Sequence, residues 1–209
     1  LCAQQLEVNR FSVLKTEVHE ISGLITLNNG QQYYAINDGG NAAVVFQLDS
    51  VGRVERKVRV TNAINRDWEE LTTDGKEYLY IADTGNNKQK RNKGVIYRIK
   101  LQELSQQDEV QADSIEIVYQ QYPEKKPKGK HRKFDVEAMC WTDGKIFFFT
   151  KNWANDIQQK TDVYVLDPKP GIHTLNPEKR IAYANRFFME SQITGSCLDQ
   201  ASQNIFWLT

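Results

Sequence analysis

The sequence predicts an all-β fold built from a repeated four-stranded unit. Aromatic and β-branched residues gather in short runs, such as 32–36 and 146–149, and such runs are typical of strands rather than helices. Hairpin turn signals separate the runs, among them Asn29-Gly30, Asp74-Gly75 and Asp143-Gly144, because Asn-Gly and Asp-Gly favour tight turns. The third observation is that one sequence unit recurs along the chain.

In each copy of the unit a polar residue opens one strand, and the next strand ends in Asp, Asn or Lys. The equivalent positions in the four copies are Ser22, Glu69, Glu137 and Thr194. They are roughly 50 to 70 residues apart, and a four-stranded unit of roughly 40–50 residues is the signature of a β-propeller blade. The sequence therefore predicts a β-propeller of four-stranded antiparallel blades with insertions in the longer copies.

Alternation and turn residues place the strands of three blades. The first blade is expected over 21–26, 32–37, 43–48 and 53–61. The second is expected over 68–73, 77–83, 95–100 and 114–119. The third is expected over 136–141, 145–150, 161–166 and 179–184, and a fourth begins at Ile193. Insertions fall at 88–94, near 101–112, where a helical turn is expected, and at 120–133.

The two ends of the chain suggest an incomplete propeller. Residues 11–18 are predicted as an outermost strand without inner strands before it. The chain holds about three and a half blades, whereas propellers have four to eight. We therefore expect an N-terminal fragment of a propeller that is six-bladed when complete. The alternative is a naturally short β-protein with an open sheet, but the edge strands of that sheet would be left unpaired.

This interpretation divides the chain into residues 1–10, a signal-peptide remnant or flexible N-terminus, and 11–209, a partial β-propeller domain. A lipidated Cys2 is the less favoured alternative, since Leu1 rather than a small residue precedes it. Cys140 and Cys197 fall at equivalent places in two copies of the unit and form no zinc-binding spacing. They are expected to be small buried residues of first strands rather than a disulfide.

Composition narrows the classes of partner. The formal net charge is +0 at pH 7, so nothing draws the whole chain toward nucleic acid or an anionic membrane. No apolar run approaches the roughly 18 residues of a membrane span. We therefore expect neither a nucleic-acid partner nor a membrane span.

The strand order predicts which polar residues meet. In a four-stranded meander the start of the first strand, the end of the second and the loops between blades share one face, which is the mouth of the central channel. The polar residues expected at this mouth are Asn37, Asp38, Asp67, Glu69, Asp83, Asn86, Asn87, Asp135, Glu137, Lys151 and Asn152. Carboxylate and amide oxygens are the ligands that calcium uses, and the weak metal candidates are Glu69, Glu137, Asp38, Asp83 and Asn87. The same residues could instead bond the loops of neighbouring blades together.

Two basic insertions, 88–93 and 125–133, should emerge on the same face. With the mouth they give the ligand-binding candidates Lys90, Arg91, Arg132, Lys151 and Asn152. Basic loops beside an acidic mouth would suit an anionic ligand bridged by a cation, although they could equally be solvated loops. Aromatic residues do not interleave the second run, so the pattern for single-stranded nucleic acid is missing.

The motifs 65–71, 79–87, 134–139 and 149–153 resemble a group of secreted Bacteroidetes β-propeller proteins associated with type IX secretion. The resemblance runs from about Glu20 to Asp199 and implies a secreted or cell-surface location, on the periplasmic or outer-membrane side. More distantly, 21–24 with 67–69 is similar to phytase-like esterase and lactonase-type propellers, some of which hold calcium at the channel mouth. The motif 83–87 also looks like the NHL repeat.

These features predict a secreted binding or scaffold domain with a site on its top face for an extracellular ligand. The alternative is a calcium-assisted hydrolase of an ester, lactone or phosphoester. In that alternative Glu69 and Glu137 would bind the metal, and the basic loops would hold an anionic substrate. A catalytic nucleophile is not evident, because the sequence contains no GxSxG elbow.

Overall fold

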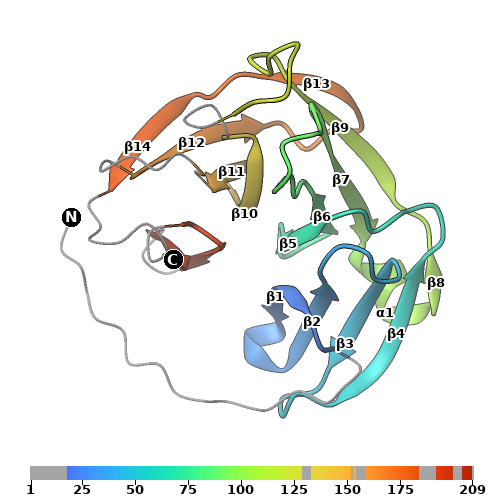
Figure 1. The fold of residues 1–209 in the computed structure, drawn as a ribbon. Helices are drawn as coiled ribbons and strands as arrows, with labels where there is room; N and C mark the ends of the chain where they lie inside the picture. Colours follow the sequence, from blue (N-terminus) through green and yellow to red (C-terminus); the bar gives the residue numbers. More distant parts are fainter. Residues whose placement is uncertain are drawn as a thin grey trace.

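The computed structural model describes residues 18–128, 133–151, 153, 159–183, 192–199 and 204–208. These residues form an all-β protein whose strands lie in four separate sheets, none of which closes on itself. Figure 1 shows the sheets set around a common centre, with β1, β5 and β10 innermost and the later strands of each sheet further out.

The first sheet is an antiparallel meander of four strands that follow one another in the chain. Its strands are β1 (Ile21–Leu27), β2 (Gln32–Asn37), β3 (Val44–Leu48) and β4 (Val54–Val60). A 3-10 turn, η1 (Asn28–Gly30), joins β1 to β2. The short β8 (Glu109–Val110) then adds to β4 in the parallel direction.

The second sheet repeats this plan. Its strands are β5 (Trp68–Thr73), β6 (Tyr78–Asp83), β7 (Lys93–Lys100) and β9 (Asp113–Tyr119), with β13 (Gly171–Leu175) parallel to β9. The helix α1 (Leu101–Gln106) follows β7. The predicted helical turn near 101–112 is therefore confirmed.

The third sheet has the same four-stranded order, and a two-stranded sheet follows it. The strands of the third sheet are β10 (Asp135–Thr142), β11 (Lys145–Lys151), β12 (Gln159–Leu166) and β14 (Lys179–Tyr183). The last two strands, β15 (Gly195–Asp199) and β16 (Asn204–Leu208), pair in an antiparallel hairpin. The strands predicted for the three four-stranded units are thus confirmed, with small shifts at their ends. The predicted strand at 11–18 lies outside the described residues except for Val18.

Neighbouring sheets are held together by apolar side chains that fill the space between them. One cluster joins the first two sheets and contains Ile36, Trp68 and Leu79. A second cluster joins the second and third sheets and contains Ile96 and Phe148. Burial of such large side chains contributes about 1.5–3 kcal/mol each, so these layers fix the sheets relative to one another and bring their first strands together.

The first strand of each of the first three sheets carries the same irregularity. The pairing register shifts between Ile21 and Gly23 in β1, between Trp68 and Glu70 in β5, and between Val136 and Ala138 in β10. The skipped residues are Ser22, Glu69 and Glu137, the same three positions that the sequence aligned. A bulge re-aims the side chain of the extra residue, and here it does so at corresponding places around the centre.

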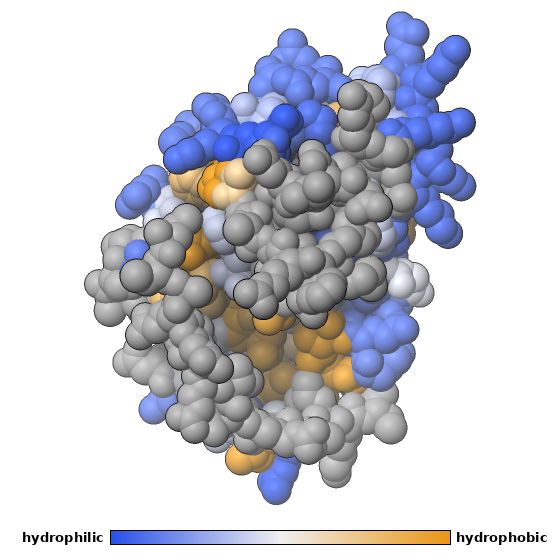
Figure 2. All heavy atoms as spheres, turned by 60° about the vertical axis from the view of Figure 1, so that its left-hand side comes forward, coloured by the Kyte–Doolittle hydropathy of each residue, from blue (hydrophilic) through white to orange (hydrophobic). Residues whose placement is uncertain are grey.

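Some large hydrophobic side chains of the described residues remain on the surface. Figure 2 shows hydrophobic side chains gathered in the lower middle of one face. Leu24 on β1 and Leu208 on β16 are among the exposed large hydrophobic residues. The described part of the chain contains no helix with the length and apolarity to traverse a bilayer.

Candidate metal centre

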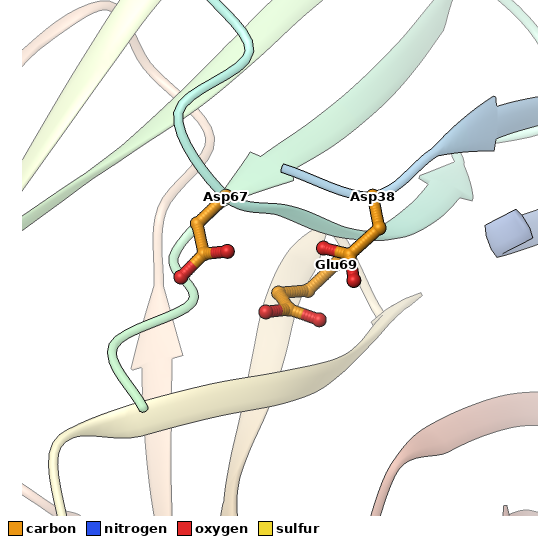
Figure 3. Close-up of side chains that lie close together, drawn as sticks. All are labelled: Asp38, Asp67 and Glu69. Atoms are coloured by element: carbon orange, nitrogen blue, oxygen red, sulfur yellow. The ribbon is translucent and has the colours of Figure 1, made fainter. Parts of the chain in front are cut away.

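Five carboxylates from three sheets meet near the start of the first strands. The carboxylate oxygens of Asp38, Asp67 and Glu69 lie within 4.8 Å of one another, and so do those of Glu69, Asp135 and Glu137. Figure 3 shows the first group, with Asp38 following β2, Asp67 preceding β5 and Glu69 within β5. Because Glu69 belongs to both groups, the five residues form one acidic cluster.

Exposure differs between the two halves of the acidic cluster. Glu69, Asp135 and Glu137 are buried, Asp67 is half-buried and Asp38 is exposed. The outer group of Asp38, Asp67 and Glu69 is therefore open to solvent on one side. The inner group of Glu69, Asp135 and Glu137 is closed off.

Burial and mutual repulsion act on the cluster together. Burial, followed by the charges of Glu137, Asp38, Asp67 and Asp135, raises the pKa of Glu69 far above its ordinary range. Burial and the Asp38 and Asp135 charges raise the pKa of Asp67 to about 6. Carboxylates that lie close together favour protonation of some of them. The raised pKa values therefore indicate that the surrounding residues do not neutralise all the negative charge of the cluster.

Two side chains support the inner group. The Lys151 Nζ atom lies 2.8 Å from the Glu137 carboxylate and 5.0 Å from the centre of the Trp153 ring. The Trp153 Nε1–H donates to Asp135. These contacts lower the pKa values of Glu137 and Asp135 against the larger effect of burial, which raises both. In the described residues no comparable basic side chain pairs with Asp38, Asp67 or Glu69.

Glycine residues let two loops close around the outer group. A Cβ atom at position 85 would lie 2.1 Å from Glu69 Oε1 and 2.5 Å from Asp67 Oδ2. A Cβ atom at position 39 would lie 2.6 Å from Asp67 Oδ1. Only glycine, which has no Cβ atom, fits at positions 39 and 85. The Gly39 backbone therefore lies directly against Asp67, and the Gly85 backbone lies against both Asp67 and Glu69.

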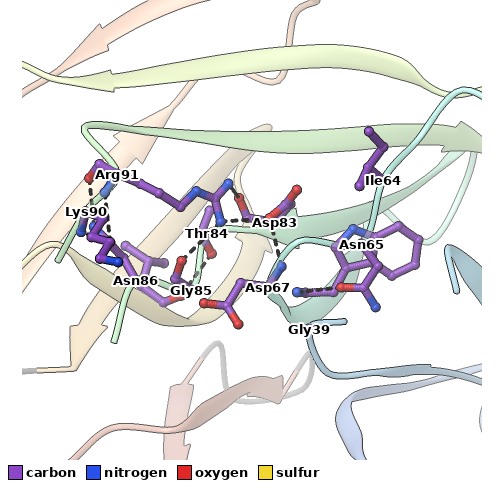
Figure 4. Close-up of polar contacts among 12 residues, drawn as sticks. Gly39, Ile64, Asn65, Asp67, Asp83, Thr84, Gly85, Asn86, Lys90 and Arg91 are labelled. Carbon is purple, nitrogen blue, oxygen red and sulfur yellow. Dashed lines mark hydrogen bonds and ion pairs between the residues drawn. The ribbon is translucent and has the colours of Figure 1, made fainter. Parts of the chain in front are cut away.

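Two buried asparagines hold these loops in place (Figure 4). Asn65 donates to the carbonyls of Asn37 and Asp38 and accepts the Trp68 N–H, which links the first and second sheets. Asn86 links the second and third sheets, since its Nδ2 donates to the Phe134 carbonyl at 2.9 Å. Its backbone N–H also donates to Asp135. These contacts support the alternative to metal binding, in which polar residues of this region bond neighbouring loops together.

The structure brings together three of the five metal candidates, namely Asp38, Glu69 and Glu137. The other two belong to neither group. Asp83 instead accepts a hydrogen bond from Arg91 Nη1 at 2.9 Å and another from the Asp67 N–H, while Asn87 is exposed. The loop that follows β6 folds back and gives Asp83 a basic partner, Arg91.

The ligand-binding candidates also separate. Lys151 lies in the acidic cluster, whereas Arg91 is committed to Asp83 and to the Gly85 carbonyl. Lys90 is exposed, and only its backbone N–H is held, by Asn86 Oδ1. Arg132 and Asn152 lie outside the described residues.

One functional group was not anticipated. Glu70 is buried in β5, directly after Glu69 in the sequence, and its carboxylate accepts the N–H groups of Leu71 at 2.9 Å and Ser196 at 3.2 Å. Burial raises the pKa of Glu70 to about 8. The sequence signal that could have identified Glu70 is a second acid directly after Glu69, in a strand whose other residues are expected to be buried.

Comparison with known proteins gives one family. The model of a family described as "Family of unknown function (DUF6929)" matches residues 21–183, which is most of the chain. The matched region includes every strand of the first three sheets and the whole acidic cluster. A search of curated proteins found no match.

Proposed function

Because the chain belongs to DUF6929, a family of unknown function, we propose a function from the acidic cluster. The protein is a binding domain that holds a calcium ion between Asp38, Asp67 and Glu69. The observation that carries this proposal is that three carboxylates from two sheets place oxygens within 4.8 Å of one another. Oxygens on opposite sides of a calcium ion are separated by about twice the Ca–O distance of 2.3–2.6 Å, which this group matches.

The outer group suits the ion better than the inner group. It is open on the Asp38 side, whereas Glu137 in the inner group already has the Lys151 ammonium at 2.8 Å. Calcium accepts a flexible set of six to eight oxygen ligands, while magnesium requires near-ideal octahedral geometry. Three carboxylates on two different loops and one strand fit the more tolerant ion, and water or a bound ligand would complete its shell.

We also propose that the sheets are successive blades of a β-propeller. Three observations support this: the repeated four-stranded order, the bulge at Ser22, Glu69 and Glu137, and the contacts of β5 with β1 and β10. In this arrangement the acidic cluster lies at the channel mouth. A site of this kind would suit a secreted protein, since extracellular calcium modules bind with dissociation constants of about 10⁻⁴–10⁻³ M.

Binding is proposed in preference to hydrolysis. A hydrolase of an anionic ester would need a basic group free to hold substrate next to the ion. Within the described residues, Lys151 is paired with Glu137 and Arg91 with Asp83. The geometry therefore assigns these charges to the protein itself.

Calcium is expected to stabilise the folded protein. At a concentration 100 times its Kd, a ligand that binds only the folded state adds about 2.7 kcal/mol to the free energy of unfolding. Differential scanning calorimetry of the EDTA-treated protein, with and without calcium at pH 7.5, measures this as a rise in Tm. The variant Asp67→Asn/Glu69→Gln removes two of the three negative charges that hold the ion, so the rise in Tm should be strongly reduced.

The matched control is Glu137→Gln, which changes an acid of the inner group alone. It should keep the calcium-dependent rise in Tm. No rise in the wild-type protein would refute the calcium proposal. A rise that survives Asp67→Asn/Glu69→Gln but disappears in Glu137→Gln would move the ion to the inner group.

A further inference from the structure

The first two sheets each carry an additional outer strand that comes from the sheet after them. β8 lies in the connection between β7 and β9 of the second sheet, yet it pairs with β4, the last strand of the first sheet (Figure 1). β13 lies in the connection between β12 and β14 of the third sheet and pairs with β9, the last strand of the second. Both pairings are parallel. In this fold the outer edge of a sheet therefore accepts a short parallel strand.

The pairing of β8 with β4 shows which contacts such an edge makes. The Arg59 N–H donates to the Asp108 carbonyl at 2.8 Å, and the Arg59 guanidinium lies 2.5 Å from the Glu109 carboxylate. A second arginine of β4, Arg56, pairs with the Asp108 carboxylate at 3.1 Å. Backbone hydrogen bonds thus hold the added strand, while basic side chains of β4 match the acids of β8.

β14 occupies in the third sheet the place that β4 and β9 occupy in the first two. Among the described residues β14 pairs with β12 alone, so its outer edge presents N–H and C=O groups that have no strand partner there.

The residues around this edge are more basic than acidic. Lys179 and Arg180 of β14 are exposed. Arg180 shares the Asp162 carboxylate with Lys133, whose Nζ atom lies 3.4 Å from it. The other acid beside the strand is Glu178, which directly precedes it. Positive charge therefore remains in excess along β14.

We propose that the outer edge of β14 binds an extended acidic segment of another protein as an additional parallel strand. The pairs β4–β8 and β9–β13 supply the geometry, and the excess of basic side chains supplies charge complementarity. A second copy of β14 fits less well, because lysine on an edge strand opposes pairing with an identical strand. The inference does not depend on the calcium proposal, since β14 contributes no residue to the acidic cluster.

A peptide with the sequence of residues 107–112, blocked at both ends, is the probe, because it contains β8 and its two acids. NMR titration of the EDTA-treated protein at low ionic strength should shift the amide signals of β14 more than those of β4 and β9, whose edges already carry a strand. The matched peptide Asp108→Asn/Glu109→Gln should bind with a Kd about three- to tenfold higher. This difference should shrink in about 1 M salt.

Two controls separate backbone pairing from charge. Methylation of the peptide nitrogens of Glu109 and Val110, whose N–H groups point to opposite edges of a strand, blocks pairing along either edge and should abolish binding. In the protein, Lys179→Gln should weaken binding of the acidic peptide about threefold. Lys76→Gln, at an exposed position between β5 and β6, should leave the Kd unchanged.

Several results would overturn the proposal. They are the absence of binding, equal affinity for the acidic and the neutral peptide, equal binding of the methylated peptide, and shifts centred away from β14. Broadening of the β14 signals that depends on protein concentration alone would instead assign this edge to a second copy of the chain.

Discussion

Replacing Glu70 by Gln in the metal-free protein is expected to raise stability relative to the wild type by on the order of 4 kcal/mol as the pH goes from 5 to 9. Burial raises the pKa of this carboxyl from its ordinary 4.5 to about 8. The folded state therefore binds a proton that the unfolded state has already released between these two pH values. The stability that Glu70 contributes is fully present below pH 4.5 and is lost as the pH rises toward 8. Gln cannot ionise, so the variant avoids this loss.

Denaturant unfolding at pH 5 and at pH 9, in EDTA, measures the effect. At pH 5 the variant should be less stable than the wild type by about 1–3 kcal/mol, because the Gln NH2 group cannot accept the Leu71 or Ser196 N–H that a carboxylate oxygen accepts. Between pH 5 and pH 9 the stability of the variant relative to the wild type should rise by on the order of 4 kcal/mol. Glu55→Gln on the exposed side of β4 should differ little from wild type at either pH. A gain from Glu70→Gln that does not change with pH would show that Glu70 is not a buried ionisable group.

Replacing Asn86 by Ala is expected to lower the free energy of unfolding by about 3–5 kcal/mol. The Asn86 side chain donates to the carbonyls of Arg91 and Phe134 and accepts the N–H groups of Lys90 and Arg91. Ala would leave these groups without their partner in a buried place, and each such loss costs about 1–3 kcal/mol before any rehydration. Chemical denaturation at pH 7.5 measures the change.

The variant Asn86→Asp separates the hydrogen bonds that the Asn86 side chain donates from those that it accepts. It keeps an acceptor for the Lys90 and Arg91 N–H groups but loses both donors and adds a charge near Asp135, so it should also be strongly destabilising. Lys88→Ala, an exposed position in the same loop, should change stability by less than about 0.5 kcal/mol. If Asn86→Ala were as mild as Lys88→Ala, the loop would not be held by this residue.

The sequence predicted the strands well because their signals are local. Alternating apolar residues and Asp-Gly turns define each meander without knowledge of its neighbours, as at Asp74-Gly75 and Asp143-Gly144. The parallel strands β8 and β13 were missed for the opposite reason. They are short, and they form by pairing with the last strand of the preceding sheet, which is a long-range contact.

The candidate site was predicted in part. The repeat placed Glu69 and Glu137 at equivalent positions, and the shared bulge does bring them into one cluster. Asp83 lies outside the acidic cluster and pairs with Arg91, a contact that depends on how the following loop folds back. Asn65 was missed as a linker, since its contacts with Asn37 and Asp38 cross between two sheets.

Cys197 shows a similar limit. Cys140 is buried on β10 as expected, but Cys197 on β15 is exposed, and neither forms a disulfide. The equivalent position in the repeat predicted the strand but not its burial. Burial depends on a neighbouring sheet, and the described residues place none on the outer side of the β15–β16 hairpin.

The most direct test of the calcium proposal is a crystal structure of the protein grown with calcium, with the ion identified by its anomalous scattering. The proposal predicts one ion bound by oxygens of Asp38, Asp67 and Glu69 at about 2.3–2.6 Å, with water or a ligand on the Asp38 side. Lys151 should remain paired with Glu137. A site without an ion at saturating calcium, or an ion held instead by Asp135 and Glu137, would contradict it.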